Sequence, residues 1–521
     1  MKNLLIVSIL LLAISNIFAF TGREKELKMG VYIYDYAFRR TAAANGENLK
    51  DFVEKHFKIL QQHRVNAIHL TVNRKDGMEF QEIWLPLMKK YGIKGYLQLD
   101  FAYFSYESTW NEKMENIRAK YAASFIEKFK NEPQIIAFSI REEVAHNQVH
   151  AMAYYYQKIK GLVPDFEYFI VHSGLGAAKD HPVPDPVIFG TDRYAFWWEF
   201  SGNGYLATPA SALNWLRNEA ANYQAEAAKR GADFLWVITA NAFVMGSDAP
   251  EKGWARSWKN PILREKILRY TREKRFGWNK DKVGKDEILW AWKWYLPPKN
   301  CTKAMIWTGI LEGAKSILFW SYNPPADKME ANSPAEAISR RIARRPARHK
   351  GDISWVSMAG RPGIENTSLK EFAQTAEELA PYSKLICMMN KSPESPVITD
   401  KKKKIFNRAF TIPTYNGKII VIHNANVGRW PGNKAVFGSN DNIKIDKNGN
   451  LEGYIPFKTP QKVDFKIKKQ TQSEVFDWIT GKKISLNHNS GTVNILPGSG
   501  TMLFMGSEKE FLRLKKTQDK I

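Results

Sequence analysis

The segment IIAFSIREEV, residues 135–144, is an apolar run that ends in an arginine and two adjacent glutamates. Neighbouring carboxylates repel each other, and each raises the cost of ionising the other, so folding alone does not favour the doublet. The apolar part is typical of a buried β-strand. Polar groups at the carboxyl end of such a strand are typical of a site in a parallel α/β protein.

The same pattern of an apolar run with a polar end recurs along the chain. Seven other segments have the length and composition of buried strands. They are KMGVYIYDYAF (28–38), VNAIHLTV (65–72), KGYLQLDFAYF (94–104), FEYFIVHSG (166–174), DPVIFGTDRYAF (185–196), DFLWVITANAF (233–243) and KSILFWSYNPP (315–325). Amphipathic segments such as residues 48–64 and 116–133 lie between them and have helical spacing. Eight such alternations predict an α/β fold, a (β/α)8 TIM barrel over residues 28–385.

The remainder of the chain has a different pattern. Residues 386–404 are rich in Pro, Ser and Lys and read as a linker. Beyond them come short strands with turn residues and no helical periodicity, in KIIVIHNANVG (418–428), KVDFKIKK (462–469), SEVFDWITGKKI (473–484) and GTVNILPGSGTMLFM (491–505). We therefore predict a small all-β domain, a β-sandwich, over residues 405–507 and a basic tail over 508–521. Trp430 and Trp478 are expected in its core rather than on sugar.

The first residues of the chain have the features of a secretory signal peptide. Lys2 precedes an apolar run over residues 4–14, and Ala19 offers a cleavage position, so residues 1–19 are predicted to be removed on export. We expect a secreted or periplasmic protein without a stable membrane anchor, because no later segment is apolar for long enough to span a bilayer. The two cysteines, Cys301 and Cys387, are expected to be free thiols more often than a disulfide.

The net charge of the chain limits the kinds of molecule that the protein is expected to bind. Lys and Arg total 77 against 53 Asp and Glu, a formal net charge of +24. A field of this sign attracts polyanions. Export and the lack of zinc-finger or RNA-binding signatures argue against nucleic acid, which leaves an anionic polysaccharide, sulfated or rich in uronic acid. The alternative is that the lysines only cover solvated faces.

Polar and aromatic side chains gather at the predicted strand ends, which share one face of a barrel. The candidate site residues are Asp35, Tyr36, Arg39, Arg74, Asp100, Arg141, Glu142, Glu143, Asp192, Arg193, Tyr194, Asn241, Trp320, Tyr322 and Asn323. Several carboxylates combined with aromatic faces suit glycoside hydrolysis, in which one carboxylic acid protonates the leaving oxygen and a second carboxylate acts as nucleophile or base.

Metal and cofactor chemistry have less support in the sequence. His146 and His150 have the spacing of zinc ligands on a helix, but Asn147 stands where the metalloprotease motif has glutamate. No phosphate-binding loop and no Gly-x-Ser-x-Gly elbow is present. We expect no metal and no cofactor.

The fourth strand segment resembles the acid/base strand of the large TIM-barrel glycosidase superfamily that includes β-galactosidases and cellulases. In that superfamily an aromatic residue is followed, after a short gap, by Asn-Glu. Aligned on Phe138, the resemblance places Glu143 at the acid/base position and Glu142 where the superfamily has its asparagine. The stretch AMIWTGILEGAKSILFWSYN (304–323) resembles the seventh helix and eighth strand of these enzymes, which implies that Trp320 and Tyr322 floor the sugar site.

The chain departs from the superfamily after the seventh strand, where Asn241 stands in place of the nucleophilic glutamate. Asp192 is our candidate for the second carboxylate, with Asp35 or Asp100 as alternatives. We also hypothesise that Glu142 raises the pKa of Glu143, as a general acid near neutral pH requires.

The positions of the arginines along the sequence are consistent with an anionic substrate. An arginine-rich run over residues 340–350 follows the eighth strand, and Arg39, Arg40, Arg74, Arg141 and Arg193 follow others. Arginine's planar fork suits carboxylate and sulfate oxygens. The sequence thus predicts a glycoside hydrolase that acts on an anionic polysaccharide. The alternatives are an inactive barrel that binds such glycans and a polysaccharide lyase that uses Tyr or His as base.

Overall fold

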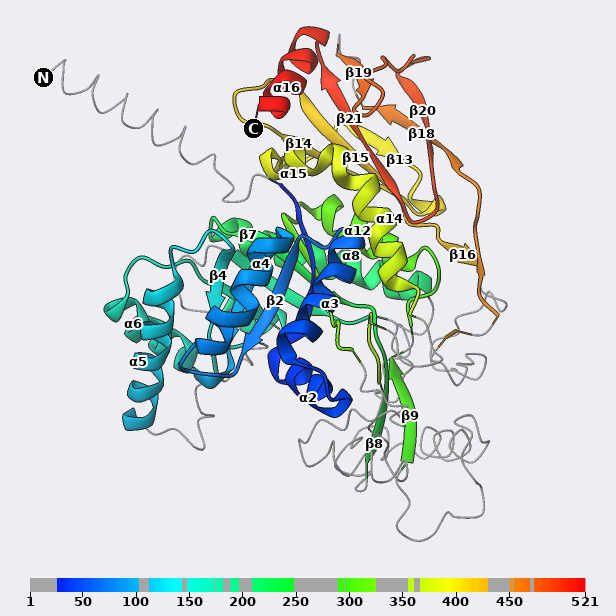
Figure 1. Ribbon diagram of the computed structural model, residues 1–521. Coiled ribbons are helices and arrows are strands. Elements are labelled where there is room, and N and C mark those ends of the chain that lie inside the picture. The colour runs from blue at the N-terminus through cyan, green and yellow to red at the C-terminus, as the bar shows by residue number, and fades with distance from the viewer. Residues whose placement is uncertain are drawn as a thin grey trace, which may run out of the picture.

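The computed structural model describes residues 26–102, 112–142, 148–172, 174–180, 188–195, 209–247, 289–294, 296–324, 355–359, 366–429, 450–451, 453–468 and 473–520 (Figure 1). Several predictions lie outside the described residues. They are the signal peptide at 1–19, Glu143, His146, the arginine-rich run at 340–350 and Trp430.

Eight parallel strands form one sheet in the order β4-β3-β2-β1-β10-β7-β6-β5. They are β1 (Lys28–Tyr34), β2 (Ala67–Val72), β3 (Lys94–Leu99), β4 (Ile135–Ser139), β5 (Phe169–His172), β6 (Ile188–Arg193), β7 (Asp233–Thr239) and β10 (Ser316–Trp320). A parallel bridge between Phe138 and Tyr168 joins β4 to β5, and the Phe138 amide donates to the Glu167 carbonyl at 2.9 Å. The bridge joins the two edge strands of the sheet, so the predicted (β/α)8 barrel is confirmed.

Helices cover the outside of the sheet. They are α2 (Asp35–Asn45), α3 (Leu49–Gln62), α4 (Leu85–Tyr91), α5 (Glu112–Phe129), α6 (Val149–Leu162), α7 (Leu175–Lys179), α8 (Pro209–Lys229), α12 (Cys301–Glu312) and α14 (Ser368–Leu379), with a π-helical turn η1 (Phe80–Trp84) before α4 and a 3-10 turn η2 (Asp100–Ala102) after β3. Helix α3 begins where predicted, because the Asn48 side chain accepts from the amides of Lys50 and Asp51.

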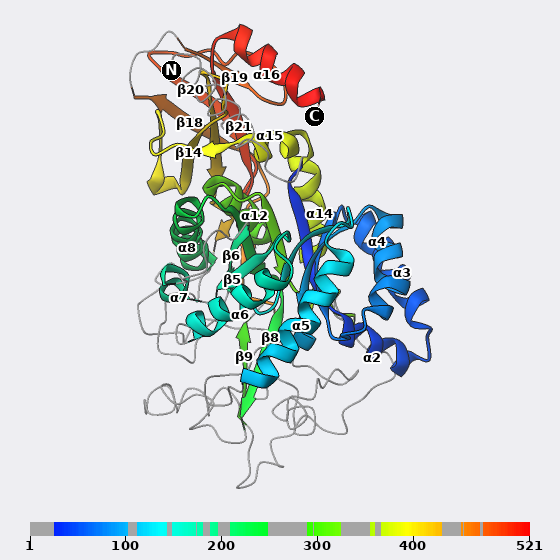
Figure 2. The same ribbon diagram turned by 90° about the vertical axis from the view of Figure 1, so that its left-hand side faces the viewer.

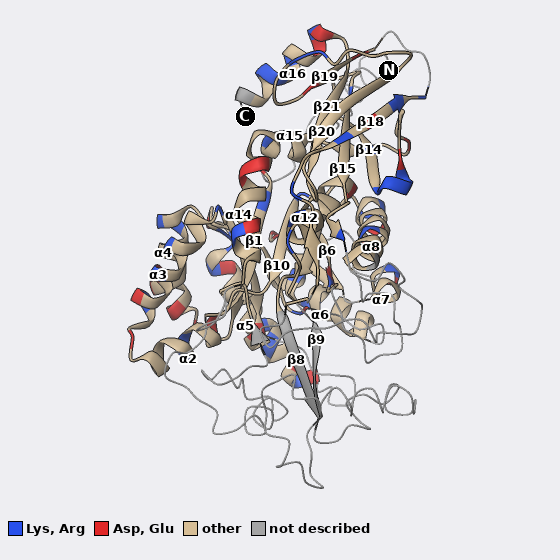
Figure 3. Cartoon of the chain, turned by 90° about the vertical axis from the view of Figure 1, so that its right-hand side faces the viewer, with Lys and Arg blue, Asp and Glu red and all other residues tan. Residues whose placement is uncertain are grey.

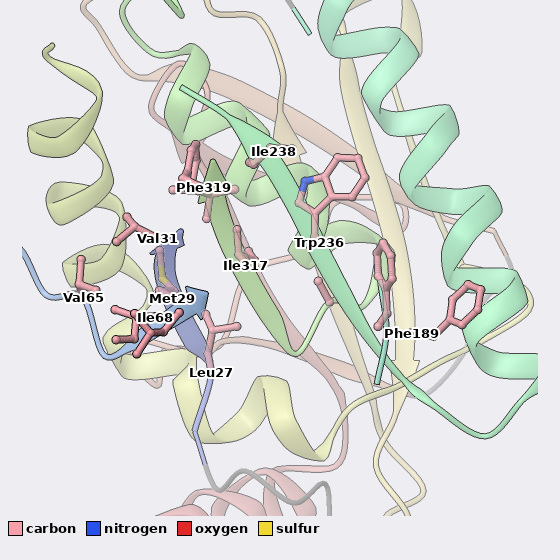
Figure 4. Packing of buried hydrophobic residues seen from close by; sticks show 14 of the residues in the cluster. Leu27, Met29, Val31, Val65, Ile68, Phe189, Trp236, Ile238, Ile317 and Phe319 are labelled. Atoms are coloured by element: carbon pink, nitrogen blue, oxygen red, sulfur yellow. The ribbon is translucent and has the colours of Figure 1, made fainter. Parts of the chain in front are cut away.

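Successive side chains along each barrel strand point alternately to two hydrophobic cores, one between the sheet and the helices and one inside the barrel. In β1, Val31 and Ile33 face the helices, whereas Tyr32 belongs to the cluster inside the barrel. Figure 4 shows the outer layer, where Trp236, Ile317 and Phe319 pack between sheet and helices. The same period of two decides which strand-end side chains point toward the barrel axis.

The C-terminal region forms two antiparallel sheets, β12-β14-β15-β21-β19 and β13-β18-β20. Their strands are β12 (Asn390–Lys391), β13 (Val397–Thr399), β14 (Ile405–Thr411), β15 (Lys418–Asn424), β18 (Gln461–Ile467), β19 (Glu474–Asp477), β20 (Ser490–Ile495) and β21 (Gly500–Gly506), and a separate pair joins β16 (Gly428–Arg429) to β17 (Ile455–Pro456). An apolar cluster lies between the two sheets, as the β-sandwich prediction requires. Trp478 is fully buried, as expected.

Two segments differ from the composition-based description. Residues 386–404, read as a linker, contain the end of α15 (Ser383–Met388), both β12 and β13, and a 3-10 turn η7 (Lys401–Lys403), because Val397 and Thr399 alternate inward despite the surrounding Pro and Lys. The basic tail is a helix, α16 (Glu508–Lys520), whose Phe511 and Leu514 are buried. Short apolar repeats within these basic segments decide their structure.

The sandwich packs along α12, whose twelve residues are all buried. Views from two directions show the sandwich at one end of the molecule and the hairpin of β8 (Ala242–Ser247) and β9 (Leu289–Trp294) at the other (Figures 1 and 2). The hairpin follows β7, so it marks the end of the barrel where the strands terminate, and β11 (Trp355–Val356) pairs with β8 there.

Two composition-based expectations concern membranes and thiols. Among the helices of the described ranges, none has the length and apolar character needed to cross a bilayer. Cys301 and Cys387 are free thiols, the first of them buried.

Candidate active site

Two carboxylates lie at the carboxyl ends of β4 and β6, and their charges influence a buried tyrosine of β1. Asp192 shares the inward parity of Ile188 on β6, and Glu142 follows β4. Tyr32 is fully buried inside the barrel. Burial is the main cause that raises the pKa of Tyr32 well above its usual range, and the charges of Glu142 and Asp192 add to it. The phenol therefore stays protonated at neutral pH.

An aromatic group lies beside these carboxylates. The indole Nε1 of Trp320 donates to the Tyr34 hydroxyl at 2.6 Å. The rings of Tyr194 and Trp320 stack with centroids 5.2 Å apart and an interplanar angle of 25°. Burial, followed by the charge of Glu142, raises the pKa of Tyr34 as well. One face of the Trp320 indole therefore stacks on the Tyr194 ring, and its N–H edge is hydrogen-bonded to the Tyr34 hydroxyl.

A polar layer supports the site from below. The rings of Tyr32 and His69 stack at 3.8 Å with an angle of 11°. Burial lowers the pKa of His69 to about 3, so this imidazole is neutral at pH 7. Gln98 lies next in the layer and donates through Nε2 to Asp100 at 2.7 Å. Asp100 is thereby oriented by the barrel interior.

Asp35, Arg39 and Arg74 belong to a separate network on the α2 side. Asp35 accepts from the Asn73 amide at 2.9 Å and from the Asn73 side chain at 2.5 Å. Arg39 makes two 2.9 Å hydrogen bonds to Glu79 and a 3.4 Å contact to Asp35, and Arg74 lies 3.8 Å from Glu79. These contacts tie α2 to the segment before η1, and Asp35 serves them as an internal acceptor.

Arg193 and Tyr322, both predicted to contact substrate, point away from the barrel axis. Arg193 has the outward parity of β6, and its Nε lies 2.6 Å from Glu219 of α8. The Tyr322 hydroxyl lies 2.9 Å from Nδ1 of His56 on α3. Trp320 and Tyr322 therefore lie on opposite sides of the chain, which turns outward after β10.

Asn241 and Asn323 meet at a serine beyond β7 and β10. Asn241 Nδ2 donates to the Ser321 hydroxyl at 3.3 Å, and Asn323 Nδ2 donates to the same oxygen at 2.7 Å. Both asparagines are buried. Through their shared serine the two asparagines join the ends of β7 and β10.

The remaining predicted residues flank the centre. Arg141 is buried at the end of β4, and half-buried Tyr36 lies 5.5 Å from the Tyr34 ring. Glu143 falls outside the described residues. Within the described ranges, no three His, Cys, Asp or Glu side chains gather as metal ligands.

Sequence reasoning overlooked Tyr32 and Tyr34. Both lie in the first strand run, where tyrosine fits an ordinary buried strand. Their spacing of two places them on one face, opposite Val31 and Ile33. The V-Y-I-Y alternation at the end of a strand was the available signal.

Comparisons with known proteins give fold-level similarity alone. No protein-family model matches the chain, and no curated protein matches it. Solved structures that it resembles include AmyP in complex with maltose (TM-score 0.47, 8% identity, covering 93% of this chain and 97% of that one). An Anoxybacillus α-amylase has a TM-score of 0.41 at 10% identity, covering 92% of this chain and 98% of its own. A glycoside hydrolase family 5 mannosidase from Rhizomucor miehei has a TM-score of 0.40 at 12% identity, covering 68% and 93%. Since these TM-scores are all below 0.5, the barrel assignment rests on the strand order and register described above.

Proposed function

We propose that this protein is a glycoside hydrolase whose site lies at the carboxyl ends of the barrel strands. The observation that carries the proposal is that Glu142 follows β4 and Asp192 ends the inward side of β6, so that two carboxylates lie at the carboxyl ends of strands separated only by β5. Hydrolysis of a glycosidic bond needs two carboxyl groups on opposite sides of the bond. In our proposal Glu143 is the general acid and Asp192 is the second carboxylate.

The aromatic group supports a sugar substrate. Trp320 is held at its edge by Tyr34 and at one face by Tyr194. An indole fixed in this way offers a flat apolar surface on which the C–H face of a pyranose packs. Side chains immobilised before binding lose little conformational entropy when the substrate arrives.

The lyase alternative is less consistent with these residues. A lyase would need a side chain that removes a proton from carbon, such as a phenolate or a neutral imidazole. Burial and the charge of Glu142 raise the pKa of both Tyr32 and Tyr34, so neither is a phenolate at neutral pH. His69 is neutral but lies stacked beneath Tyr32, inside the barrel. Hydrolysis by carboxylates therefore suits the site better.

An anionic substrate and export remain parts of the proposal that rest on the sequence. The net charge of +24 favours a polyanion. Figure 3 shows Lys and Arg interspersed with Asp and Glu on helices such as α14 and α16. Of the strand-end arginines, we assign Arg141, which is buried at the end of β4, to a uronate or sulfate group of the substrate.

The test is a reducing-end assay of the purified protein on sulfated, uronic and neutral polysaccharides. Wild type is expected to cleave an acidic glycan, and Glu143→Gln and Asp192→Asn are each expected to lose at least a hundredfold in kcat. Arg193→Gln, which alters an arginine directed at α8, is the matched control and should keep the wild-type KM. Binding without cleavage would instead support the inactive barrel, and a product with new ultraviolet absorbance would indicate a lyase.

A further inference from the structure

We propose that the outer face of the sheet β13-β18-β20 is a binding surface for a linear acidic polysaccharide, separate from the candidate active site. The proposal rests on the proposed function, because it takes the polymeric substrate of that function as the bound chain. It gives the C-terminal sandwich a binding task of its own.

The two sheets of the sandwich differ in what covers them. The larger sheet meets the barrel, since Lys391 of β12 and Arg408 of β14 pair with Glu312 of α12. Helix α16 packs against the same sheet, with the Phe511 ring 4.9 Å from that of Phe476 on β19. The smaller sheet packs by its inner face on the larger one, and its strands alternate buried and exposed residues. Its outer face is therefore a solvent-exposed surface of the sandwich.

A line of lysines runs along the central strand of this face. Lys462 and Lys466 share the outward side of β18, Lys468 continues the alternation, and all three are exposed. Side chains two residues apart on a strand lie about 7 Å from each other. Within the described ranges, none of these three ammonium groups has a carboxylate partner, whereas Lys483 pairs with Glu474 on the same domain. The charges of this line are thus available to an external anion.

The edge of the sheet adds further cations. The turn η7 follows the edge strand β13, and its residues Lys401–Lys403 are all exposed. Two nearby carboxylates are bonded within the protein, because Asp400 accepts from the amides of η7 and Asp464 accepts from the Thr492 hydroxyl at 2.8 Å. Glu394, before β13, is exposed. The lysines outnumber these three acids, so the face has a net positive charge.

Hydroxyl, amide and apolar side chains lie beside the lysines. Ser490 of β20 and Ile398 of β13 are the register partners of Lys466 on its two sides. Asn494 of β20 is the register partner of Lys462 and is exposed. Cross-strand partners on one face lie about 5 Å apart, so a single bound chain reaches both kinds of group. Ammonium groups bind sulfate or carboxylate, whereas hydroxyl and amide groups bond to sugar hydroxyls. A polymer that carries both, an acidic polysaccharide, matches this face.

This face and the candidate active site lie toward opposite ends of the molecule. Figures 1 and 2 show the sandwich at one end and the β8–β9 hairpin, which follows barrel strand β7, at the other. A short oligosaccharide therefore occupies one of the two sites at a time, whereas a polymer engages both. Engagement of both sites raises the effective concentration of the polymer at the active site. The face should therefore lower KM for a polymer and leave KM for an oligosaccharide unchanged.

The experiment measures binding of the whole protein to immobilised dextran sulfate, polygalacturonate, neutral dextran and duplex DNA at two salt concentrations. The test variant combines three substitutions, Lys462→Gln, Lys466→Gln and Lys468→Gln. The matched control removes the same number of charges from exposed positions of α3, by Lys50→Gln, Lys55→Gln and Lys58→Gln. All of these side chains are exposed, so both triple variants should keep the wild-type urea midpoint.

Wild type should bind at least one of the two acidic polysaccharides and leave neutral dextran unbound, and the acidic polymer that binds more tightly identifies the anionic group. The test variant should weaken this binding about tenfold and reduce its salt dependence, because fewer counterions are displaced. The control should weaken it by less than about threefold. Asn494→Ala, which changes no charge, should weaken binding severalfold with the same salt dependence. Equal losses in both triple variants, or tighter binding of DNA than of either acidic polysaccharide, would overturn the proposal.

Kinetics separate this proposal from the proposed function. In an active enzyme, the test variant should raise KM for the acidic polymer severalfold while kcat and the KM for a short oligosaccharide stay at their wild-type values. An unchanged KM for the polymer would overturn the link between this face and the substrate. A wild type that binds the acidic polymer through these lysines but cleaves no glycan would reject the proposed function and support the binding surface.

Discussion

Glu312 and Glu142 lie in two regions of the molecule and are surrounded by opposite kinds of partner. Glu312, the last residue of α12, is fully buried where the barrel meets the sandwich, 2.6 Å from Lys391 and 3.0 Å from Arg408. The charge of Glu142, at the end of β4, adds to burial in raising the pKa values of Tyr32 and Tyr34. A carboxylate at a helix C-terminus is disfavoured by the helix dipole, so Glu312 depends on its cations.

The difference shows how one residue type serves two purposes. Cations bind an ionised carboxylate firmly and remove it from proton chemistry. Neutral donors orient a carboxylate while leaving its proton affinity within reach of physiological pH. Glu312 is thus a structural clamp between the barrel and the sandwich, whereas Glu142 belongs to the site that we propose for chemistry.

The largest effect is expected from breaking the clamp. Glu312→Gln leaves Lys391 and Arg408 without a buried counter-charge, and we expect the free energy of unfolding to fall by about 3 kcal/mol. Urea denaturation measures this loss. Glu377→Gln, which removes the partner of Arg64 from an exposed pair 3.4 Å apart, is the control and should cost less than about 0.5 kcal/mol. A Glu312→Gln protein as stable as wild type would contradict the clamp.

The next largest effect is expected at Glu142, and it is a loss of activity rather than of stability. Glu142→Gln keeps the size of the side chain and removes its charge, so we expect kcat to fall about a hundredfold while the unfolding free energy changes by less than about 1 kcal/mol. Initial rates and urea midpoints from one preparation test both statements. A variant that is unstable but fully active would place Glu142 with Glu312 among the structural acids.

All eight barrel strands were predictable, because each carries a run of β-branched or aromatic residues separated by helical periodicity. The direction of side chains beyond strand ends was harder to predict. Asp192 and Arg193 are adjacent in sequence, and only the parity of β6 in the sheet decides that one faces the axis and the other faces Glu219. Trp320 and Tyr322 are two residues apart, yet the turn after β10 sends them to opposite sides.

Composition alone did not predict the strands in residues 386–404 or the helix in residues 508–521. A count of Lys, Pro and Ser does not register that two or three inward apolar residues suffice to add a strand or dock a helix. Tyr32 and Tyr34 were missed for a related reason, since the role of a tyrosine in a strand depends on what its hydroxyl meets. The Tyr34 hydroxyl, for example, accepts from Trp320 of β10, 286 residues away along the chain.

Buried histidines in the barrel and in the sandwich are expected to make the stability of the protein depend on pH. Burial lowers the pKa of His56 and His69 in the barrel, and of His423 in the sandwich, to about 3. The unfolded chain binds these protons near pH 6.5 and the folded chain only near pH 3. Stability is therefore complete above about pH 6.5 and falls below it by up to about 1.4 kcal/mol per pH unit for each histidine.

A variant tests this pH dependence in one domain at a time. His423→Gln should flatten the fall of the unfolding free energy between pH 6.5 and pH 4, measured by urea denaturation at several pH values. The same substitution should leave the pH profile of kcat unchanged, because His423 lies in β15 and outside the barrel. A slope equal to that of wild type would show that His423 is protonated in the folded protein.

The smallest effect is expected at Tyr322, and it separates the two sides of the eighth barrel strand. Tyr322→Phe removes the hydroxyl that lies 2.9 Å from His56 and should cost about 1 kcal/mol of unfolding free energy with no change in kcat or KM. Trp320→Phe keeps an aromatic face but loses the indole donor to Tyr34, so it should raise KM with a similar loss of stability. If both variants raised KM alike, the sugar would have to contact both sides of the chain after β10, which the hydrogen bond between Tyr322 and His56 opposes. A difference confined to Trp320 would place the platform on the inward side, with the tyrosines of β1.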